Sequence, residues 1–281
     1  MLTLVLATLA APALARADGH SAAPHSGHRG VQVKGQKAQR VSPFTESASS
    51  AANIPGKLVN HGGPVMTANT VHAIYWFPSG YSLDSSWRGV VDGYLGNVAA
   101  DSGTTSNVFS VTSQYNVSYD ATFAGSAVDT APFPASGCSS GLNGQPCLTE
   151  EQIFNELSAF AQSQGWPADT NAVSGSNPQP STHPTHLFIV YLPPGVADCF
   201  DDTQGICSAN SSDSYYCAYH TAWYDNTHTY VWANMPWSWS NRGCQGPKAP
   251  NGATADSAVD TTSHEYIEAL TDPYLNAWYD T

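Results

Sequence analysis

Two uninterrupted apolar segments, "VHAIYWF" (71–77) and "THLFIVYL" (185–192), constrain the fold of this chain more than any other feature. Both are rich in β-branched and aromatic residues and are closed by prolines, which is typical of buried strands. A third segment of this kind, "HTYVWANM" (228–235), follows later in the chain. Because helix signals alternate with these strands, the sequence predicts a single α/β or α+β domain with helices packed on a mixed sheet.

Two of the helix signals combine an N-terminal cap with an apolar face. Asp84 can cap a helix whose apolar residues recur at helical spacing. Thr149 and Gln152 have the spacing of a capping box and predict the start of a second helix. Between the two helices, "NVFSVTSQY" (107–115) and "VSYDATFAG" (117–125) have strand composition, and we expect two adjacent strands there.

The N-terminal part of the chain indicates export. "LTLVLATLAAPALARA" is a short apolar run that ends in small residues, and it predicts a signal peptide over residues 1–17. Residues 18–56 lack apolar periodicity and are expected to form a disordered leader or pro-segment before a domain at 57–281. No later stretch has the length of a transmembrane helix, so we expect a secreted protein without a membrane span.

The six cysteines agree with an exported protein, in which an even number favours disulfides over metal thiolates. Fifteen connectivities are open in principle. Nearest-neighbour pairing would staple three loops, through Cys138–Cys147, Cys199–Cys207 and Cys217–Cys244. The alternative, a zinc knuckle, is disfavoured because no pair has the two-residue spacing of such sites.

The charge distribution excludes one class of partner. The formal net charge is −13, and 20 of the 22 acidic residues but only three of the nine basic residues follow position 57. A domain this acidic repels phosphate backbones and anionic membranes, so we expect no nucleic-acid partner.

The motif with the most specific chemistry is "TTSHEYIEALTDP" (261–273). On a helix, His264 and Glu268 lie on the same face, one turn apart, and can hold one metal ion between them. Glu265 is displaced by one position and can act as the general base that accepts a proton from metal-activated water. Carboxylates ligate Zn²⁺, although a second anionic ligand lowers its Lewis acidity and makes calcium more competitive. The alternative is a solvated helix face without a metal.

Asp256 or Ser257 can cap this helix, and Pro273 ends it. The segment resembles the zinc helix of thermolysin-type metallopeptidases, which runs His-Glu-x-x-His-Ala-x-Thr-Asp. The positions that match are His264, Glu265, Ala269, Thr271 and Asp272. Glu268 departs from the pattern, because that family has a histidine there.

The resemblance implies a third metal ligand. In thermolysin-type enzymes it is a glutamate well downstream of the helix, whereas this sequence ends at Thr281. Either the sequence is a fragment and the ligand lies beyond the chain end, or Asp272, His220 or Asp280 completes the site. Asp272 can instead orient His264 or cap the end of the helix.

A second resemblance covers residues 57–245. "NHGGPVM" (60–66), "CAYH" (217–220) and "YVWANM" (230–235) are similar to segments of the phosphate-induced, EXORDIUM-like family of secreted proteins. Plant members of that family are linked to cell-wall and growth responses. The two resemblances together imply a bacterial EXORDIUM-like protein with a metallopeptidase-like C-terminal helix.

Two functions follow as hypotheses. The first is a secreted zinc-dependent hydrolase, a peptidase with a peptide or protein substrate, in which "YVWANM" is the edge strand that aligns an extended peptide. The second is a non-catalytic extracellular protein that binds cell-wall polysaccharide, with a structural metal or none. In the second, tryptophans such as Trp237 and Trp239 would form a carbohydrate platform.

Two further patterns are weaker. "GCSSG" (137–141) matches Gly-x-Ser-x-Gly with Ser139 as nominal nucleophile, but the strand that a nucleophile elbow needs does not precede it. His61 lies in a glycine turn, where we favour a turn-stabilising role over a catalytic one.

Overall fold

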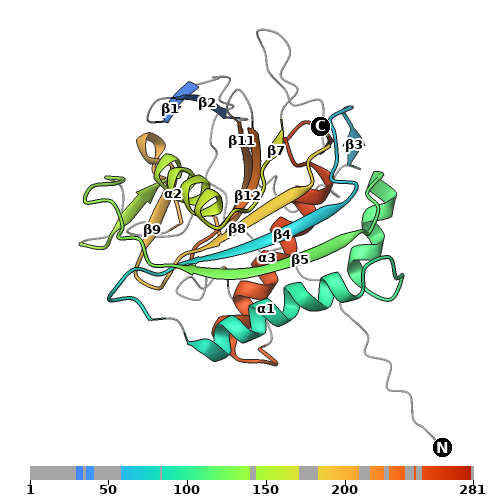
Figure 1. The fold of residues 1–281 in the computed structure, drawn as a ribbon, viewed down its shortest axis with the longest axis horizontal. Helices are drawn as coiled ribbons and strands as arrows, with labels where there is room; N and C mark the ends of the chain where they lie inside the picture. Colours follow the sequence, from blue (N-terminus) through green and yellow to red (C-terminus); the bar gives the residue numbers. More distant parts are fainter. Residues whose placement is uncertain are drawn as a thin grey trace, which may run out of the picture.

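The computed structural model confirms a single domain of helices packed on a mixed sheet (Figure 1). The residues that the structure describes are 30–33, 36–40, 58–82, 84–139, 144–170, 183–208, 216–224, 228–237, 244 and 249–279. The predicted signal peptide lies outside these residues.

Within the described residues the main sheet has eight strands, of which four neighbouring strands that reach one edge of the sheet run parallel. The parallel strands are β12 (His228–Met235), β8 (His186–Tyr191), β4 (Asn69–Trp76) and β5 (Ala121–Asp129), in this order across the sheet. The antiparallel strands are β11 (Tyr219–Tyr224), which pairs with β12, and then β2 (Gln36–Arg40), β1 (Gly30–Val33) and the short β7 (Asp169–Thr170). Strands β4 and β8 therefore form the buried centre that their apolar composition predicts.

Helices cover both faces of this sheet. One face packs against α1 (Ser85–Ala100) and α3 (Ala253–Thr271), and the opposite face packs against α2 (Glu150–Ser163). The predicted N-terminal caps are confirmed: Asp84 accepts a hydrogen bond from the Ser86 amide, and Thr149 and Gln152 form a capping box. The helix that carries the His-Glu motif thus lies against the same face as α1.

The segment 107–115 is a difference from the sequence prediction. It forms a 3₁₀ helix, η1 (Val108–Tyr115), and not a strand. Asn107 caps it by accepting a hydrogen bond from the Phe109 amide, and Asn116 closes it in the left-handed region at φ +63°. Phe109 and Thr112, three residues apart, are its buried side chains, so the local caps and the three-residue period outweigh strand composition.

The three predicted disulfides are confirmed: Cys138–Cys147, Cys199–Cys207 and Cys217–Cys244. The first two have cysteines in a small sheet of β6 (Cys147–Thr149), β9 (Ala197–Asp201) and β10 (Ile206–Cys207), and η2 (Asp202–Gln204) precedes β10. Ser139 lies in this region, where its amide and hydroxyl donate to the Asp202 carboxylate. The nucleophile-elbow pattern therefore lies in a disulfide loop.

The structure differs from two expectations, one about β12 and one about the leader segment. The prediction that "YVWANM" is an edge strand is wrong, because β12 lies between β11 and β8. Within the leader segment, for which disorder is the expectation, β1 and β2 pair antiparallel, and β2 pairs with the end of β11 at Trp223 and Tyr224. Among the described residues, no helix is long and apolar enough to cross a membrane.

A carboxyl pair lies at the end of β5, on the α2 side of the sheet. Asp129 is buried; its Oδ1 accepts a hydrogen bond from the Ala131 amide, and its Oδ2 has no donor apart from the neighbouring Glu156. Burial, followed by repulsion from Asp129, raises the pKa of Glu156 to about 7. A protonated Glu156 can donate a hydrogen bond to Asp129, whereas two neighbouring ionised carboxylates repel each other.

We expect Glu156→Gln to raise the free energy of unfolding by about 1–2 kcal/mol at pH 8 and to change it little at pH 5. A carboxyl group with a raised pKa in the folded state stabilises the fold fully below its ordinary pKa of 4.5, and this contribution is lost as pH rises through about 7. Glutamine keeps a donor for Asp129 at every pH. Urea unfolding at both pH values measures the difference, with the exposed Asp120→Asn as control. An equal effect at pH 5 and pH 8 would contradict the shared proton.

Candidate metal centre

Helix α3 positions the His-Glu motif. It begins at Ala253, earlier than the predicted caps, because the Asp256 carboxylate accepts hydrogen bonds from the amides of Asn251 and Gly252 and so fixes the turn before the helix. It ends at Thr271, before Pro273, as expected. Buried side chains from Ala255 to Leu270 hold one side of the helix against the core, so the polar side chains between them have defined directions.

The three motif residues differ in burial. His264 and Glu268 meet across one helical turn, with Nε2 of the histidine 3.0 Å from Oε1 of the glutamate. Their side chains are 54% and 42% exposed, so this pair is open to solvent. Glu265 is buried, with only 5% of its surface exposed. His264 and Glu268 therefore share one face of the helix and Glu265 is turned away from it, as the spacing predicts.

A histidine from the sheet meets this helix. Side chains of β11 alternate between the two faces: Trp223 packs on the α2 side, whereas His220 and Ala222 face α3. His220 is buried, and its Nδ1 lies 3.4 Å from Glu265 Oε2 and 3.5 Å from Glu268 Oε2. Of the two candidate ligands that the structure describes, His220 and Asp272, His220 is the one whose side chain reaches the two glutamates of the motif.

The distances around His220 are compatible with long hydrogen bonds and with ligands of one metal ion. An N–H···O hydrogen bond has its heavy atoms about 2.7–3.2 Å apart. Ligand atoms about 2.0–2.1 Å from a tetrahedral zinc ion lie about 3.3–3.4 Å from one another. His220 Nδ1 lies 3.4 and 3.5 Å from the two glutamates, and one ligand atom each of His220, Glu265 and Glu268 lies within 4.8 Å of the others. The donor set, imidazole and carboxylate, is one that zinc accepts.

The second nitrogen of His220 is also engaged. Its Nε2 lies 3.1 Å from the carbonyl oxygen of Asp272, which can only accept a hydrogen bond. Nε2 therefore carries a proton that it donates to this carbonyl, and Nδ1 is the nitrogen directed at the two glutamates, as a donor when protonated and as a ligand when it has lost its proton to a metal. Histidines that ligate metals are commonly held by a backbone carbonyl in this way.

The carboxylates of Glu265 and Glu268 can balance the positive charge of one cation between them. Burial disfavours the charged form of His220, but hydrogen bonding to Glu265 and Glu268 outweighs burial and raises its pKa to about 10. Burial also acts against ionisation of Glu268, but His220 and His264 outweigh it and hold the pKa of Glu268 well below its ordinary value. Burial raises the pKa of Glu265, and the hydrogen bond with His220 offsets this in part. A protonated imidazole therefore supplies the positive charge that a metal ion would otherwise bring.

The other two candidate ligands have different positions. The carboxylate Oδ1 of Asp272 accepts hydrogen bonds from the amides of Asn276, at 2.7 Å, and Ala277, at 2.6 Å, so it stabilises the turn after α3. Asp280 lies outside the described residues. Sequence reasoning missed the role of the Asp272 carbonyl, although carbonyls at the end of a helix lack partners within the helix and are available to a side chain.

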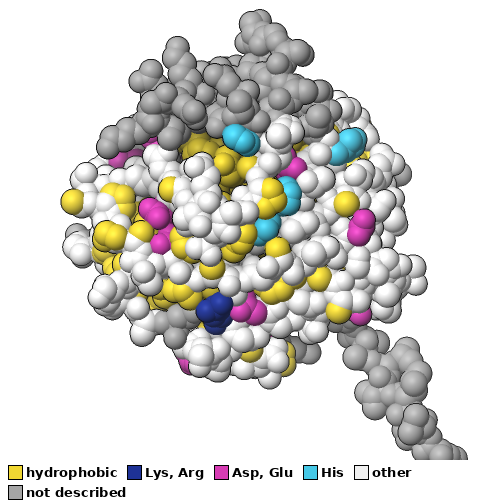
Figure 2. Space-filling view, in the orientation of Figure 1, with side chains coloured by type: hydrophobic (Ala, Val, Ile, Leu, Met, Phe, Trp, Pro, Cys, Tyr) yellow, Lys and Arg dark blue, Asp and Glu magenta, His cyan; other side chains and the backbone are white. Residues whose placement is uncertain are grey.

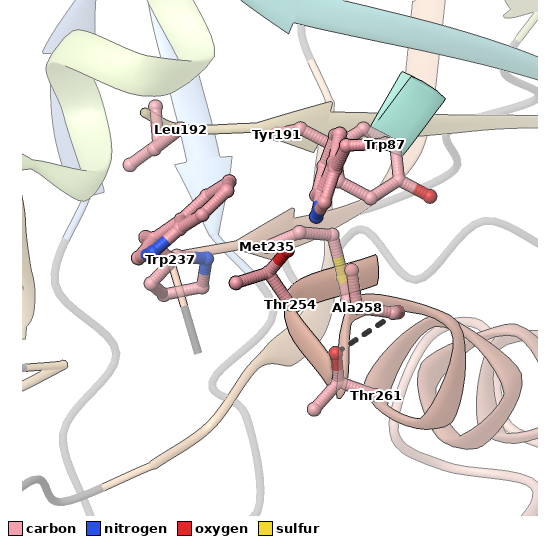
Figure 3. Close-up of a pocket in the computed structure, with 9 residues that line it drawn as sticks. Trp87, Tyr191, Leu192, Met235, Trp237, Thr254, Ala258 and Thr261 are labelled. Carbon is pink, nitrogen blue, oxygen red and sulfur yellow. Dashed lines mark hydrogen bonds between the residues drawn. The ribbon is translucent and has the colours of Figure 1, made fainter. Parts of the chain in front are cut away.

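The tryptophans proposed as a carbohydrate platform are only partly described. Trp237 packs on Trp87, with ring centroids 5.2 Å apart, beside a cavity of about 10 Å³ (Figure 3). A cavity of this size holds about one water molecule and no sugar. Trp239 lies outside the described residues.

In Figure 2, acidic side chains are scattered over the visible face and basic ones are confined to a small area.

The site therefore consists of two glutamates and one exposed histidine on α3 and one buried histidine on β11. This arrangement can bind a divalent cation with one side open to solvent, as a catalytic metal requires. Comparison with protein-family models, curated proteins and solved structures finds no match to this chain.

Proposed function

We propose that this protein is a secreted zinc-dependent hydrolase whose metal is held by His264, Glu268 and His220, with Glu265 as general base. The observation that carries the proposal is the position of His220, whose Nδ1 lies 3.5 Å from Glu268 Oε2 and 3.4 Å from Glu265 Oε2. His264 is not in the group of His220, Glu265 and Glu268 whose ligand atoms lie within 4.8 Å of one another, and it joins the site through its 3.0 Å contact with Glu268. His220 supplies, from a strand distant in sequence, the third ligand that the helix alone lacks. Residues 217–220, in the segment that resembles EXORDIUM-like proteins, thus belong to the same site as the metallopeptidase-like helix.

Each side chain has a separate task in this mechanism. Zinc held by His264, Glu268 and His220 would supply a Lewis acid that polarises a carbonyl group and lowers the pKa of water. The Glu265 carboxylate would accept a proton from water and return it to the leaving group. Its burial raises its pKa above the ordinary value, which strengthens it as a base. Glu268, as an anionic ligand, reduces the acidity of the metal and leaves calcium as a competitor.

A peptide substrate and an extracellular location belong to the same proposal. Three disulfides are typical of proteins that fold in an oxidising compartment. Residues 219–222 of β11 pair with β12 on one side, and among the described residues only positions 223 and 224 pair with β2 on the other. The peptide substrate itself rests on the resemblance of residues 264–272 to the zinc helix of thermolysin-type metallopeptidases.

Metal content tests the proposal directly. We expect the full chain to bind about one zinc ion, to lose it to a chelator, and to cleave a denatured protein substrate only with the metal present. Elemental analysis, zinc titration by calorimetry and a cleavage assay measure the three properties, with calcium titrated in parallel. A chain that binds no zinc at micromolar concentration contradicts the metal site. Stoichiometric zinc without cleavage favours the non-catalytic alternative.

A further inference from the structure

The "NHGG" segment near the start of the domain docks on the last described residues of the chain. Strand β3 (Val59–Asn60) pairs with β13 (Trp278–Tyr279). The His61 amide donates to the Ala277 carbonyl at 2.7 Å, and the imidazole ring stacks on Tyr279 with centroids 3.5 Å apart. His61 therefore stabilises the contact between two segments that are more than 200 residues apart.

Gly63 permits the closest part of this contact. Its amide donates to the Asn276 carbonyl at 3.0 Å. A Cβ atom at position 63 would lie 2.1 Å from Asn276 Oδ1 and 2.4 Å from the Asn276 carbonyl oxygen. These separations are shorter than any nonbonded contact allows, so only glycine lets the two backbones approach in this way.

The docked segment is linked in turn to the metal centre. The amides of Asn276 and Ala277 donate to the Asp272 carboxylate. The carbonyl oxygen of Asp272 accepts hydrogen bonds from the Leu275 amide and from His220 Nε2, both at 3.1 Å. These hydrogen bonds connect Gly63, through the 272–277 turn, to the side chain of the buried His220.

We propose that Asp272 is a positioning residue for His220, and that the docking of residues 61–63 on 276–277 controls the metal affinity of the site. The proposal rests on the proposed metal site. The Asp272 carbonyl fixes the imidazole with its proton on Nε2, so that Nδ1 is directed to the metal. Its position depends on the 272–277 turn, which the Asp272 carboxylate closes from within and the "NHGG" segment holds from outside.

Two variants disturb this path without touching a ligand. We expect Gly63→Ala and Asp272→Ala each to weaken zinc binding by about 10–100-fold, the range for residues that orient metal ligands. Asp272→Asn keeps an oxygen acceptor for both amides, and we expect it to retain the zinc Kd of the unmodified protein within about threefold. Competition titrations with a zinc chelator measure the Kd. The visible spectrum of the cobalt-substituted protein reports whether the coordination geometry has changed.

A control variant distinguishes the loss of His220 positioning from a general loss of stability. Phe154→Leu enlarges a cavity in the core on the α2 side of the sheet, and we expect it to lower the Tm without changing the zinc Kd or the cobalt spectrum. If Gly63→Ala and Asp272→Ala behave like this control, the positioning role is excluded while the proposed metal site stands. A failure of the unmodified protein to bind zinc or cobalt would instead remove the proposed function.

Discussion

Replacing Glu265 by Gln is expected to lower kcat/KM for a peptide substrate by about 10²–10⁴-fold while zinc remains bound. Glutamine has nearly the same shape and keeps an oxygen near His220, but it cannot accept a proton from water. Because Glu265 is buried behind the open pair of His264 and Glu268, its loss removes the base and leaves the exposed ligands in place. Cleavage rates and zinc content, measured on the same preparation, give the two quantities.

The matched control is Glu151→Gln, a partly buried glutamate on α2 on the opposite face of the sheet, which we expect to leave both quantities within about twofold. Two outcomes contradict the assignment of Glu265 in different ways. Undiminished cleavage shows that Glu265 is not the base. Loss of zinc together with activity shows that Glu265 is a ligand, in the set His220, Glu265 and Glu268 whose atoms lie within 4.8 Å of one another.

The sequence was sufficient for the elements whose signals are local. Caps at Asp84 and Thr149 and the apolar strands β4, β8 and β12 are set by residues within a few positions of each other, so their periodicity and cap chemistry predict them. Nearest-neighbour pairing of the cysteines succeeds for the same reason, because each disulfide closes a short loop. The segment 107–115 shows the limit of composition, since its caps favour a 3₁₀ helix although its residues suit a strand.

The arrangement of strands and the third ligand could not be predicted in this way. Whether β12 lies at the edge or inside depends on how β11 pairs with it, and an apolar strand has the same composition in either place. His220 was one of three candidates because nothing in the sequence around it distinguishes a ligand from a structural histidine. Only the pairing of β11 and the packing of α3 bring its ring to Glu265 and Glu268.

His220→Gln is expected to weaken zinc binding by more than about 100-fold, because it removes the buried ligand that links strand and helix. It is also expected to lower the free energy of unfolding of the metal-free protein by about 2–3 kcal/mol, since Glu265 and Glu268 then face each other without a positive charge between them. Zinc titration and urea unfolding in a chelator measure the two effects.

The same substitution at His228, on β12 and directed to the α2 side, is the matched control and should leave the zinc Kd within about twofold. The two effects of His220→Gln need not occur together, and this makes the experiment decisive. If stability falls and zinc affinity does not, His220 is only the partner of a buried ion pair and the metal is held elsewhere. If both fall, one imidazole balances the carboxylates without metal and ligates the metal when it binds.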